Sequence, residues 1–135
     1  MENCIFCKIA EGTIPSIKVY EDEEFLAFQA LGQASPGHTL LIPKEHSEDF
    51  LEMNSKLSEK MNSIAQKIGK AMMKALSADG MNISFNIKPA GGQEIMHTHM
   101  HLVPRFEKDG LKLFPLTDAS EEERIMFAGK IIKEL

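Results

Sequence analysis

The sequence predicts an α+β domain built on an antiparallel sheet, and three observations support this class. Five short apolar segments have the composition of strands, and most of them follow one another as hairpins. Only two segments are long enough to form sizeable helices. The chain has 135 residues, of which 43% are hydrophobic and 26% charged, so we expect a single domain over residues 1–135.

Turn residues bound the predicted strands. Residues 17–20 and 25–28 flank an acidic turn, and Pro43 ends a third strand over residues 38–42. The last two strands are expected over residues 81–87 and 96–106. Before all of them, residues 4–10 indicate a single helical turn.

Residues 55–78 predict the long helix, because apolar residues recur there at intervals of three and four and form one stripe. We expect Ser55 to begin this helix and Asp79-Gly80 to end it. A C-terminal helix is predicted after Ser120. Its first turn carries three glutamates, where the helix dipole favours negative charge.

Charge and hydropathy exclude some classes of protein. The formal net charge is −5, whereas nucleic-acid-binding proteins need a basic patch. No apolar run approaches the roughly 20 residues that span a bilayer, and the first residues do not have the pattern of a signal peptide. We therefore expect a cytoplasmic protein that binds neither nucleic acid nor membranes.

Three of the five histidines, His97, His99 and His101, alternate within five residues. On a strand this spacing places them on one face, about 6–7 Å apart. They could be incidental residues of a half-exposed strand, or ligands of a catalytic zinc ion. In the third interpretation, a neutral imidazole acts as nucleophile on phosphorus, and the loop over residues 91–93 supplies hydrogen-bond donors.

The segment from Gly92 to Arg105 resembles the signature of the histidine triad (HIT) superfamily, in which histidines alternate with apolar residues. Residues 4–9, 19–22 and 36–46 match further landmarks in order, and the chain is most similar to the Hint-like and general HIT hydrolases. The resemblance implies a five-stranded antiparallel sheet with one long helix, in a homodimer. It also implies action at the α-phosphate of nucleoside phosphoramidates or dinucleoside polyphosphates, through a nucleotidyl-histidine intermediate.

The resemblance assigns roles to individual residues. His99 matches the nucleophile, and His101 and His97 match the other catalytic triad positions. The substrate-binding positions for a purine nucleotide or nucleotide conjugate follow in two groups. Asn86, Gly92 and Gln93 are expected near the phosphate, and Ile5, Phe6, Ile9, Phe28 and Leu31 around the nucleoside. The apolar residues could instead be ordinary core, above all Ile5 and Phe28. His38 is expected to be a buried, structural histidine.

Two positions depart from the family pattern. Many relatives have an aspartate, which holds the ribose hydroxyls, where this chain has Ala30, and Hint proteins have a serine where it has Glu94. Loss of the aspartate removes a charge-assisted hydrogen-bond pair of roughly 1.5–3 kcal/mol. Nucleotide identity and leaving-group preference can therefore differ from those of the Hint branch.

The pair Cys4 and Cys7 forms a Cys-x-x-Cys motif. The setting of a thioredoxin-like redox pair is missing, because no strand precedes the motif. The cysteines could be unrelated, or they could be half of a zinc site with His46 and His97. The second arrangement is similar to that of the related galactose-1-phosphate uridylyltransferases. Such a Cys₂His₂ shell is closed to water, so this zinc would be structural.

Three functions remain open on this evidence. The first is a histidine-nucleophile nucleotide hydrolase or transferase, with His99 attacking phosphorus. The second is a nucleotide-binding scaffold module with little turnover, which the loss of the aspartate at Ala30 makes credible. The third is a metal-dependent hydrolase that uses the histidines as ligands.

Overall fold

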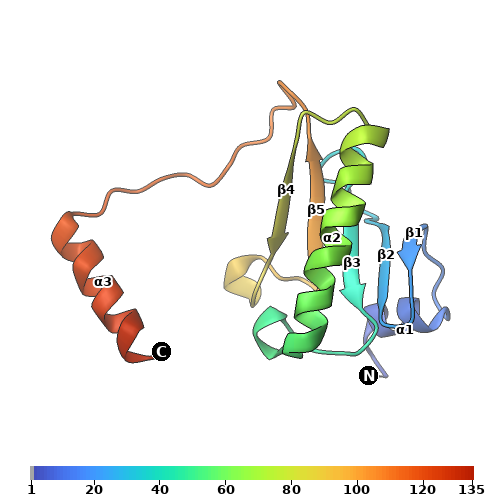
Figure 1. Ribbon diagram of the computed structural model, residues 1–135, viewed down its shortest axis with the longest axis horizontal. Helices are drawn as coiled ribbons and strands as arrows, with labels where there is room; N and C mark the ends of the chain where they lie inside the picture. Colours follow the sequence, from blue (N-terminus) through green and yellow to red (C-terminus); the bar gives the residue numbers. More distant parts are fainter. Residues whose placement is uncertain (1) are drawn as a thin grey trace.

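The computed structural model describes residues 2–135, and Figure 1 shows a five-stranded antiparallel sheet with a long helix packed on it. The strand order is β1-β2-β3-β5-β4. The predicted α+β class and antiparallel sheet are therefore confirmed. In chain order the elements are α1 (Ile5–Glu11), β1 (Lys18–Glu21), β2 (Phe25–Gln29), β3 (Thr39–Pro43), η1 (Phe50–Glu52), α2 (Ser55–Ala75), β4 (Gly80–Phe85), η2 (Pro89–Gly91), β5 (Met100–Arg105) and α3 (Glu121–Lys133).

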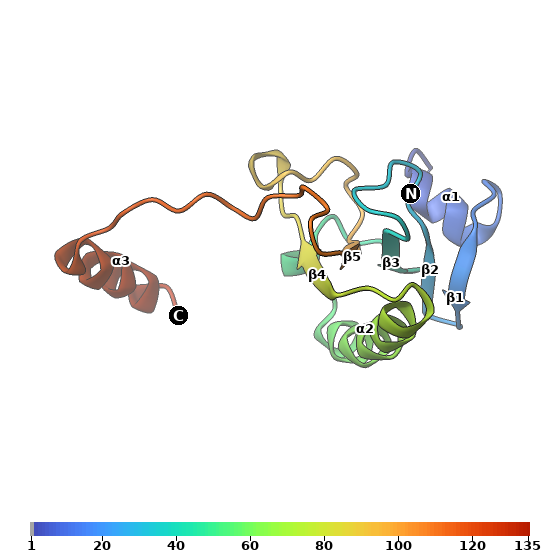
Figure 2. The same ribbon diagram turned by 90° about the horizontal axis from the view of Figure 1, so that it is seen from above.

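The sheet has a different helix on each face (Figure 2). Alternate residues of β2 point to opposite sides, as the pleat requires. Phe25 and Ala27 pack with the apolar stripe of α2, in a core that includes Met61 and Leu102. The intervening residues of β2 join Phe6 and Ile9 of α1 in a second, smaller core. The side of the sheet that carries α1 also carries the candidate site.

The long helix α2 begins at Ser55, as the sequence predicted. Asn54 is its N-cap, and the side chain of Asn54 accepts hydrogen bonds from the backbone N–H groups of Lys56 and Leu57. The helix ends at Ala75, before the expected residue 78. The predicted apolar stripe packs on the sheet over most of its length: Leu57, Met61, Ala65, Ile68 and Met72 are buried, Ile64 is partly buried, and the last residue, Leu76, is 40% exposed.

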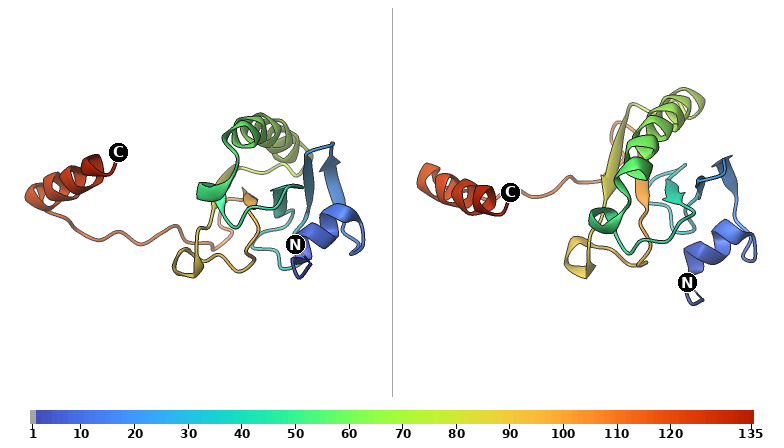
Figure 3. Two further views of the ribbon diagram at one scale, coloured as in Figure 1. Left: turned by 90° about the horizontal axis from the view of Figure 1, so that it is seen from below. Right: turned by 60° about the horizontal axis from the view of Figure 1, so that its bottom comes forward.

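The chain after residue 106 forms a C-terminal arm, residues 107–135, which extends away from the sheet in both views of Figure 3. The arm ends in α3, whose start the sequence predicted. Ser120 caps the helix through a capping box with Glu123. No residue of α3 is buried. Within the described residues, every helix falls short of the length or hydrophobicity that crossing a membrane requires.

Candidate active site and metal-binding cluster

The triad segment is not one continuous strand. The strand expected from residue 96 begins only at Met100, because the pairings of β5 with both neighbours end there. Residues 97–99 belong to no strand, with a bend at His97, and the N–H of Thr98 donates to the carbonyl of Ser47 over 2.8 Å. His101 lies on β5. The expectation that all three histidines share one strand face is therefore wrong.

His99 presents one ring nitrogen as a possible nucleophile. Its Nδ1 lies 2.7 Å from the backbone carbonyl oxygen of His97. Because a carbonyl only accepts, Nδ1 must carry the proton, and Nε2 keeps its lone pair. Burial lowers the pKa of His99, against the opposing effects of this hydrogen bond and of Glu94. The ring of Phe6 packs edge-on against the imidazole, with centroids 5.2 Å apart, and holds its orientation.

A fourth histidine, His38, forms a hydrogen-bonded chain with His101. The N–H of Ala34 donates to Nδ1 of His38 over 3.1 Å, so a neutral His38 carries its proton on Nε2. That Nε2 lies 3.0 Å from Nδ1 of His101 and donates to it. Burial lowers the pKa of His38, and lowers that of His101 to about 4, so both rings are neutral near pH 7.

The hydrogen-bonded chain from Ala34 through His38 ends at an N–H group of His101. With Nδ1 occupied as an acceptor, neutral His101 carries its proton on Nε2. This atom is buried and has no hydrogen-bond partner among the described residues. His38 is buried, as expected, but it also lies at the site, which sequence reasoning missed. The available signal was its place directly before β3, a predicted strand rich in apolar residues.

A cavity of about 940 Å³ opens beside His99 and His101 on the α1 side of the sheet. Most of its wall is apolar, and Phe6 meets Phe28 edge-on with centroids 5.6 Å apart. Among the described residues that line it there is no lysine or arginine, and Glu94 is the one carboxylate. The positions expected to bind substrate that line this cavity are Ile5, Phe6, Ile9, Phe28, Leu31, Asn86 and Gly92.

An unused hydroxyl lies where the family pattern is broken. Ala30 is buried and lines the cavity. Ser16 lines the same cavity, and its Oγ is buried without a hydrogen-bond partner among the described residues. The N–H of Gln29 donates to the carbonyl of Ile17 over 2.9 Å, which places position 16 beside position 30. Ser16 can therefore offer a ligand the hydrogen bond that Ala30 cannot.

Gln93 is the exception among the expected substrate-binding residues. Its side chain is buried, and its amide group donates to the carbonyls of Glu48 and Ile95 over 2.6 and 3.0 Å. Its oxygen accepts the N–H of Lys88 over 2.8 Å. All of these partners are backbone atoms, so Gln93 holds the loop together and does not line the cavity. The phosphate-binding role expected for it stays a prediction.

The other two residues of the phosphate region do line the cavity. Asn86 Nδ2 donates to the carbonyl of Gly92 over 3.3 Å. Gly92 has φ +90°, a left-handed conformation that glycine adopts without strain, and a Cβ there would lie 3.4 Å from Asn86 Nδ2. Because Gly92 has no side chain, the loop can lie close to the Asn86 amide while it lines the cavity.

A second cluster lies against the back of the triad segment. The side chains of Cys4, Cys7, His46 and His97 bring four possible ligand atoms within 4.8 Å of one another. Cys4 is the N-cap of α1, and its Sγ accepts the N–H of Cys7, so the helix start brings both sulfurs together. His46 follows β3, and His97 precedes β5. The four residues are those the sequence grouped as a zinc site.

The donor set fits a tetrahedral zinc ion. His97 Nε2 lies 2.8 Å from the carbonyl oxygen of Pro43, so it carries the proton and Nδ1 keeps its lone pair for the cluster. Nδ1 lies 3.3 and 3.5 Å from the sulfurs of Cys4 and Cys7, and 3.2 Å from Nδ1 of His46. Bonds of about 2.3 Å to sulfur and about 2.0–2.1 Å to nitrogen give tetrahedral edges of about 3.6 Å between S and N, and about 3.4 Å between two N.

The fold and the site together describe an α+β protein with a histidine-lined cavity and a Cys₂His₂ cluster beside it. The family model described as HIT domain matches residues 11–108. An uncharacterised HIT-like protein of Borreliella burgdorferi is 46% identical over 112 residues, which cover 82% of this chain and 81% of that protein. Adenylylsulfatase HINT3 of Arabidopsis thaliana is 39% identical over 109 residues, covering 81% and 55%. The chain belongs to the HIT family.

Solved structures agree over nearly the whole chain. SMU.412c from Streptococcus mutans is 42% identical, with a TM-score of 0.91 over 99% of this chain and 85% of that one. A HIT family protein from Bacillus subtilis is 39% identical, with a TM-score of 0.91 over 98% and 97%. A histidine triad protein from Mycobacterium smegmatis described as zinc-bound is 34% identical, with a TM-score of 0.78 over 99% of each chain.

Proposed function

We propose that this chain is a nucleotide hydrolase or transferase that acts at an α-phosphate through a nucleotidyl-histidine intermediate on His99. The observation that carries the proposal is the hydrogen bond from His99 Nδ1 to the carbonyl of His97, because it leaves Nε2 unprotonated beside the cavity. The cavity of about 940 Å³ lies within the range of small-molecule sites, about 300–1,000 Å³. The relative named an adenylylsulfatase supports this reaction class.

The reaction proceeds in two displacements. His99 Nε2 forms a bond to the α-phosphorus while the bond from phosphorus to the leaving group breaks, and the leaving group takes a proton. Water or another acceptor then forms a bond to phosphorus, the N–P bond breaks, and neutral His99 is regenerated. The Nε2–H of His101 is the preorganised donor for the developing charge, because it has no hydrogen-bond partner to give up in the described part of the chain.

The charges around the cavity favour phosphoramidates over dinucleoside polyphosphates. A polyphosphate chain brings several negative charges, and the described residues around the cavity include no lysine or arginine to neutralise them. Glu94 adds a negative charge on the same wall. A leaving amine, in contrast, departs neutral or cationic and is compatible with this carboxylate. We expect a Glu94→Gln variant to narrow the ratio of kcat/KM between the two substrate classes.

A purine nucleoside fits the apolar part of the cavity, between α1 and β2. Phe6 and Phe28 provide aromatic surface for a base, and Ser16 is the hydroxyl available to the ribose. The region beside Asn86 and Gly92 then receives the phosphate. Within this proposal, residues 1–135 act as one domain in the cytoplasm.

Zinc bound by Cys4, Cys7, His46 and His97 would stabilise the fold and supply no step of the reaction, because four protein ligands leave no position for water. The ligands would tie the start of α1 to the loop before β5. Phe6 would then be held against His99, and the carbonyl of His97 would stay in place for its hydrogen bond.

The direct test is a rapid-quench reaction with adenosine 5′-phosphoramidate, followed by intact mass measurement and peptide mapping. We expect an adenylyl adduct on His99, and no adduct in His99→Ala. Calorimetric binding of AMP to His99→Ala serves as its folding control. Turnover by His99→Ala at the native rate would refute the proposal.

The same experiment separates the two alternatives. A nucleotide-binding scaffold would bind AMP without forming an adduct or turning over any substrate. A metal-dependent hydrolase would lose turnover after treatment with a chelator while remaining folded, and would also form no adduct. Loss of folding together with activity in chelator would instead agree with a structural metal.

A further inference from the structure

Thr98 lies between two histidines with different surroundings. The side chain of His97 belongs to the Cys₂His₂ cluster, and the backbone carbonyl of His97 accepts the Nδ1–H of His99. Thr98 itself is 1% exposed. The next alternate positions along the segment, Met100 and Leu102, are apolar. A buried hydroxyl is costly unless it is hydrogen-bonded, so the hydroxyl at position 98 points to a specific hydrogen-bonding role.

Three hydrogen bonds join Thr98 to Ser47, and we call them the hydroxyl clasp. The N–H and the hydroxyl of Thr98 both donate to the carbonyl of Ser47, over 2.8 and 3.2 Å. The hydroxyl oxygens of the two side chains lie 2.6 Å apart. Because the single hydroxyl proton of Thr98 is directed at the carbonyl, the hydroxyl of Ser47 donates to Thr98 Oγ1. The clasp therefore uses both hydroxyls.

The clasp sets the direction of the His97 carbonyl, because a trans peptide unit is planar. The carbonyl of His97 and the N–H of Thr98 belong to one such unit and point in opposite directions. Since the N–H is bonded to Ser47, the carbonyl is turned away from Ser47 and lies 2.7 Å from His99 Nδ1. This contact keeps the proton on Nδ1 and leaves the lone pair of Nε2 beside the cavity.

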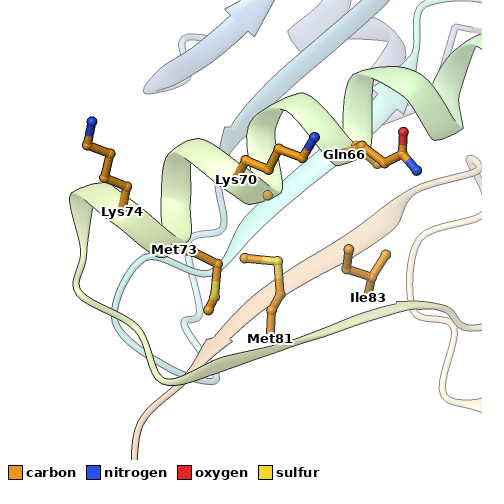
Figure 4. Close-up of a pocket in the computed structure, with 8 residues that line it drawn as sticks. Gln66, Lys70, Met73, Lys74, Met81 and Ile83 are labelled. Atoms are coloured by element: carbon orange, nitrogen blue, oxygen red, sulfur yellow. The ribbon is translucent and has the colours of Figure 1, made fainter.

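Sheet pairing does not hold this peptide unit. Figure 4 shows β4, with Met81 and Ile83, running beside β5 in the part of the sheet where the two strands pair. That pairing ends at Phe85 and Met100, and β3 also stops pairing with β5 at Met100. Thr98 lies two residues before this point. Its hydrogen bonds to the loop after β3 therefore take the place of a neighbouring strand.

We propose that Thr98 and Ser47 are positioning residues for the nucleophile His99. Neither is among the described residues that line the cavity, so their effect passes through the carbonyl of His97. The inference rests on the proposed function, since it concerns how the attacking nitrogen is kept unprotonated. Metal ligation would act on the side chain of His97, whereas the clasp acts on the peptide unit that carries its carbonyl.

Two substitutions of similar size test the hydroxyl at position 98. Thr98→Val keeps the shape and removes the hydroxyl, whereas Thr98→Ser keeps the hydroxyl. We expect Thr98→Val to lower the rate of the chemical step by about tenfold with little change in KM, which corresponds to the loss of one hydrogen bond. Thr98→Ser should stay within about threefold of the native rate. Single-turnover kinetics with adenosine 5′-phosphoramidate measures both.

Nitrogen chemical shifts of the His99 imidazole, measured by NMR, give a readout that a purely structural role would not change. At one fixed pH and without substrate, the native ring should carry its proton on Nδ1. In Thr98→Val a measurable fraction of the rings should carry it on Nε2. Because this measurement needs no substrate, it separates failure of this inference from failure of the proposed reaction. The native tautomer in Thr98→Val would overturn the inference even where the adduct forms on His99.

Ser47→Ala tests the other half of the clasp. It removes one of the three hydrogen bonds, so we expect a smaller loss of rate, about threefold. Thr98→Val already breaks the contact between the hydroxyls, so adding Ser47→Ala to it should cause no further loss. Because Ser47 is only partly buried, Ser47→Ala carries the test if circular dichroism shows Thr98→Val to be unfolded.

Ile68→Val is the control for lost stability. Ile68 lies in the core under α2, away from the clasp, so this variant should be less stable but keep the native rate and the native His99 tautomer. A native rate in Thr98→Val, or multiplied losses in the double variant, would overturn the inference.

Discussion

The hydrogen-bonded chain from Ala34 through His38 to His101 predicts opposite results for two substitutions at His38. Glutamine can replace both functions of the ring, because its oxygen can accept the N–H of Ala34 and its amide can donate to His101 Nδ1. Leucine can do neither. In His38→Leu the proton of His101 is free to move to Nδ1, and Nε2 then has no hydrogen to donate.

The size of the effect follows from the lost donor. One preorganised donor to developing charge contributes about 10²–10³ in kcat, or about 2.7–4 kcal/mol. We therefore expect His38→Leu to lower kcat by about a hundredfold or more with little change in KM, and His38→Gln to keep most of the activity. The stability cost in His38→Leu is about 0.5–1.5 kcal/mol, for the lost hydrogen bond from the N–H of Ala34, because Ala34 is exposed and water can replace the ring as acceptor.

Two measurements separate this positioning effect from simple destabilisation. Single-turnover kinetics with adenosine 5′-phosphoramidate gives the rate of the chemical step. Nitrogen chemical shifts of the imidazoles, measured by NMR, report which nitrogen of His101 carries the proton in each variant. Equal rates for the leucine and glutamine variants at position 38, or a native His101 protonated on Nδ1, would show the reasoning to be wrong.

Three further predictions follow from single contacts. Cys7→Ser should lower the amount of zinc bound per chain, measured by elemental analysis. A chelator should lower the melting temperature of the native protein to that of the variant. Gln93→Ala should lower the free energy of unfolding, measured in urea, by about 1–3 kcal/mol, because it leaves backbone groups of the loop without hydrogen-bond partners. Unchanged stability together with lost nucleotide binding would instead support the phosphate-binding role of Gln93. The side chain of Arg105, with two backbone N–H groups, holds the pKa of Asp109 well below its usual range, so the contribution of this carboxylate to stability is present above about pH 4 and is lost on acidification. The variant Asp109→Asn should therefore lose less stability than the native chain between pH 5 and pH 3, and equal losses would contradict this.

Hydrophobic periodicity was enough to predict most of the fold. The stripe of α2 and the apolar strands β2 and β3 are buried by their neighbours, so burial left a direct record in the sequence. The boundary of β5 could not be found in this way. Residues 97–99 have the alternation of a strand, but both neighbouring strands stop pairing at Met100, and pairing depends on residues far along the chain.

The candidate site shows the same division between local pattern and tertiary contact. The spacing of Cys4 and Cys7 is local, and it pointed to a metal cluster whose four members do lie together. The contact between His38 and His101 depends on the β3–β5 register, which the sequence alone does not give. The phosphate-binding role expected for Gln93 stays a prediction for a related reason. A glutamine in a loop is typical of ligand binding, and only the structure shows its amide bonded to the backbone.

The exchange of Ala30 and aspartate provides the sharpest test of where the ribose lies. If the ribose binds beside Ala30 and Ser16, Ala30→Asp should tighten AMP binding by about 1.5–3 kcal/mol, roughly ten- to a hundredfold or slightly more. The same carboxylate is buried in the ligand-free protein, so the melting temperature without nucleotide should fall.

Ser16→Ala should weaken AMP binding by about 0.5–1.5 kcal/mol, because it removes one neutral hydrogen bond. The matched ligand is 2′,3′-dideoxyadenosine monophosphate, which keeps the base and phosphate but lacks both ribose hydroxyls. Neither substitution should change its affinity by more than about twofold, since the affected hydrogen bonds are absent. If calorimetry finds equal changes for both ligands, the hydroxyls lie elsewhere, and the nucleoside binds the cavity in a different orientation.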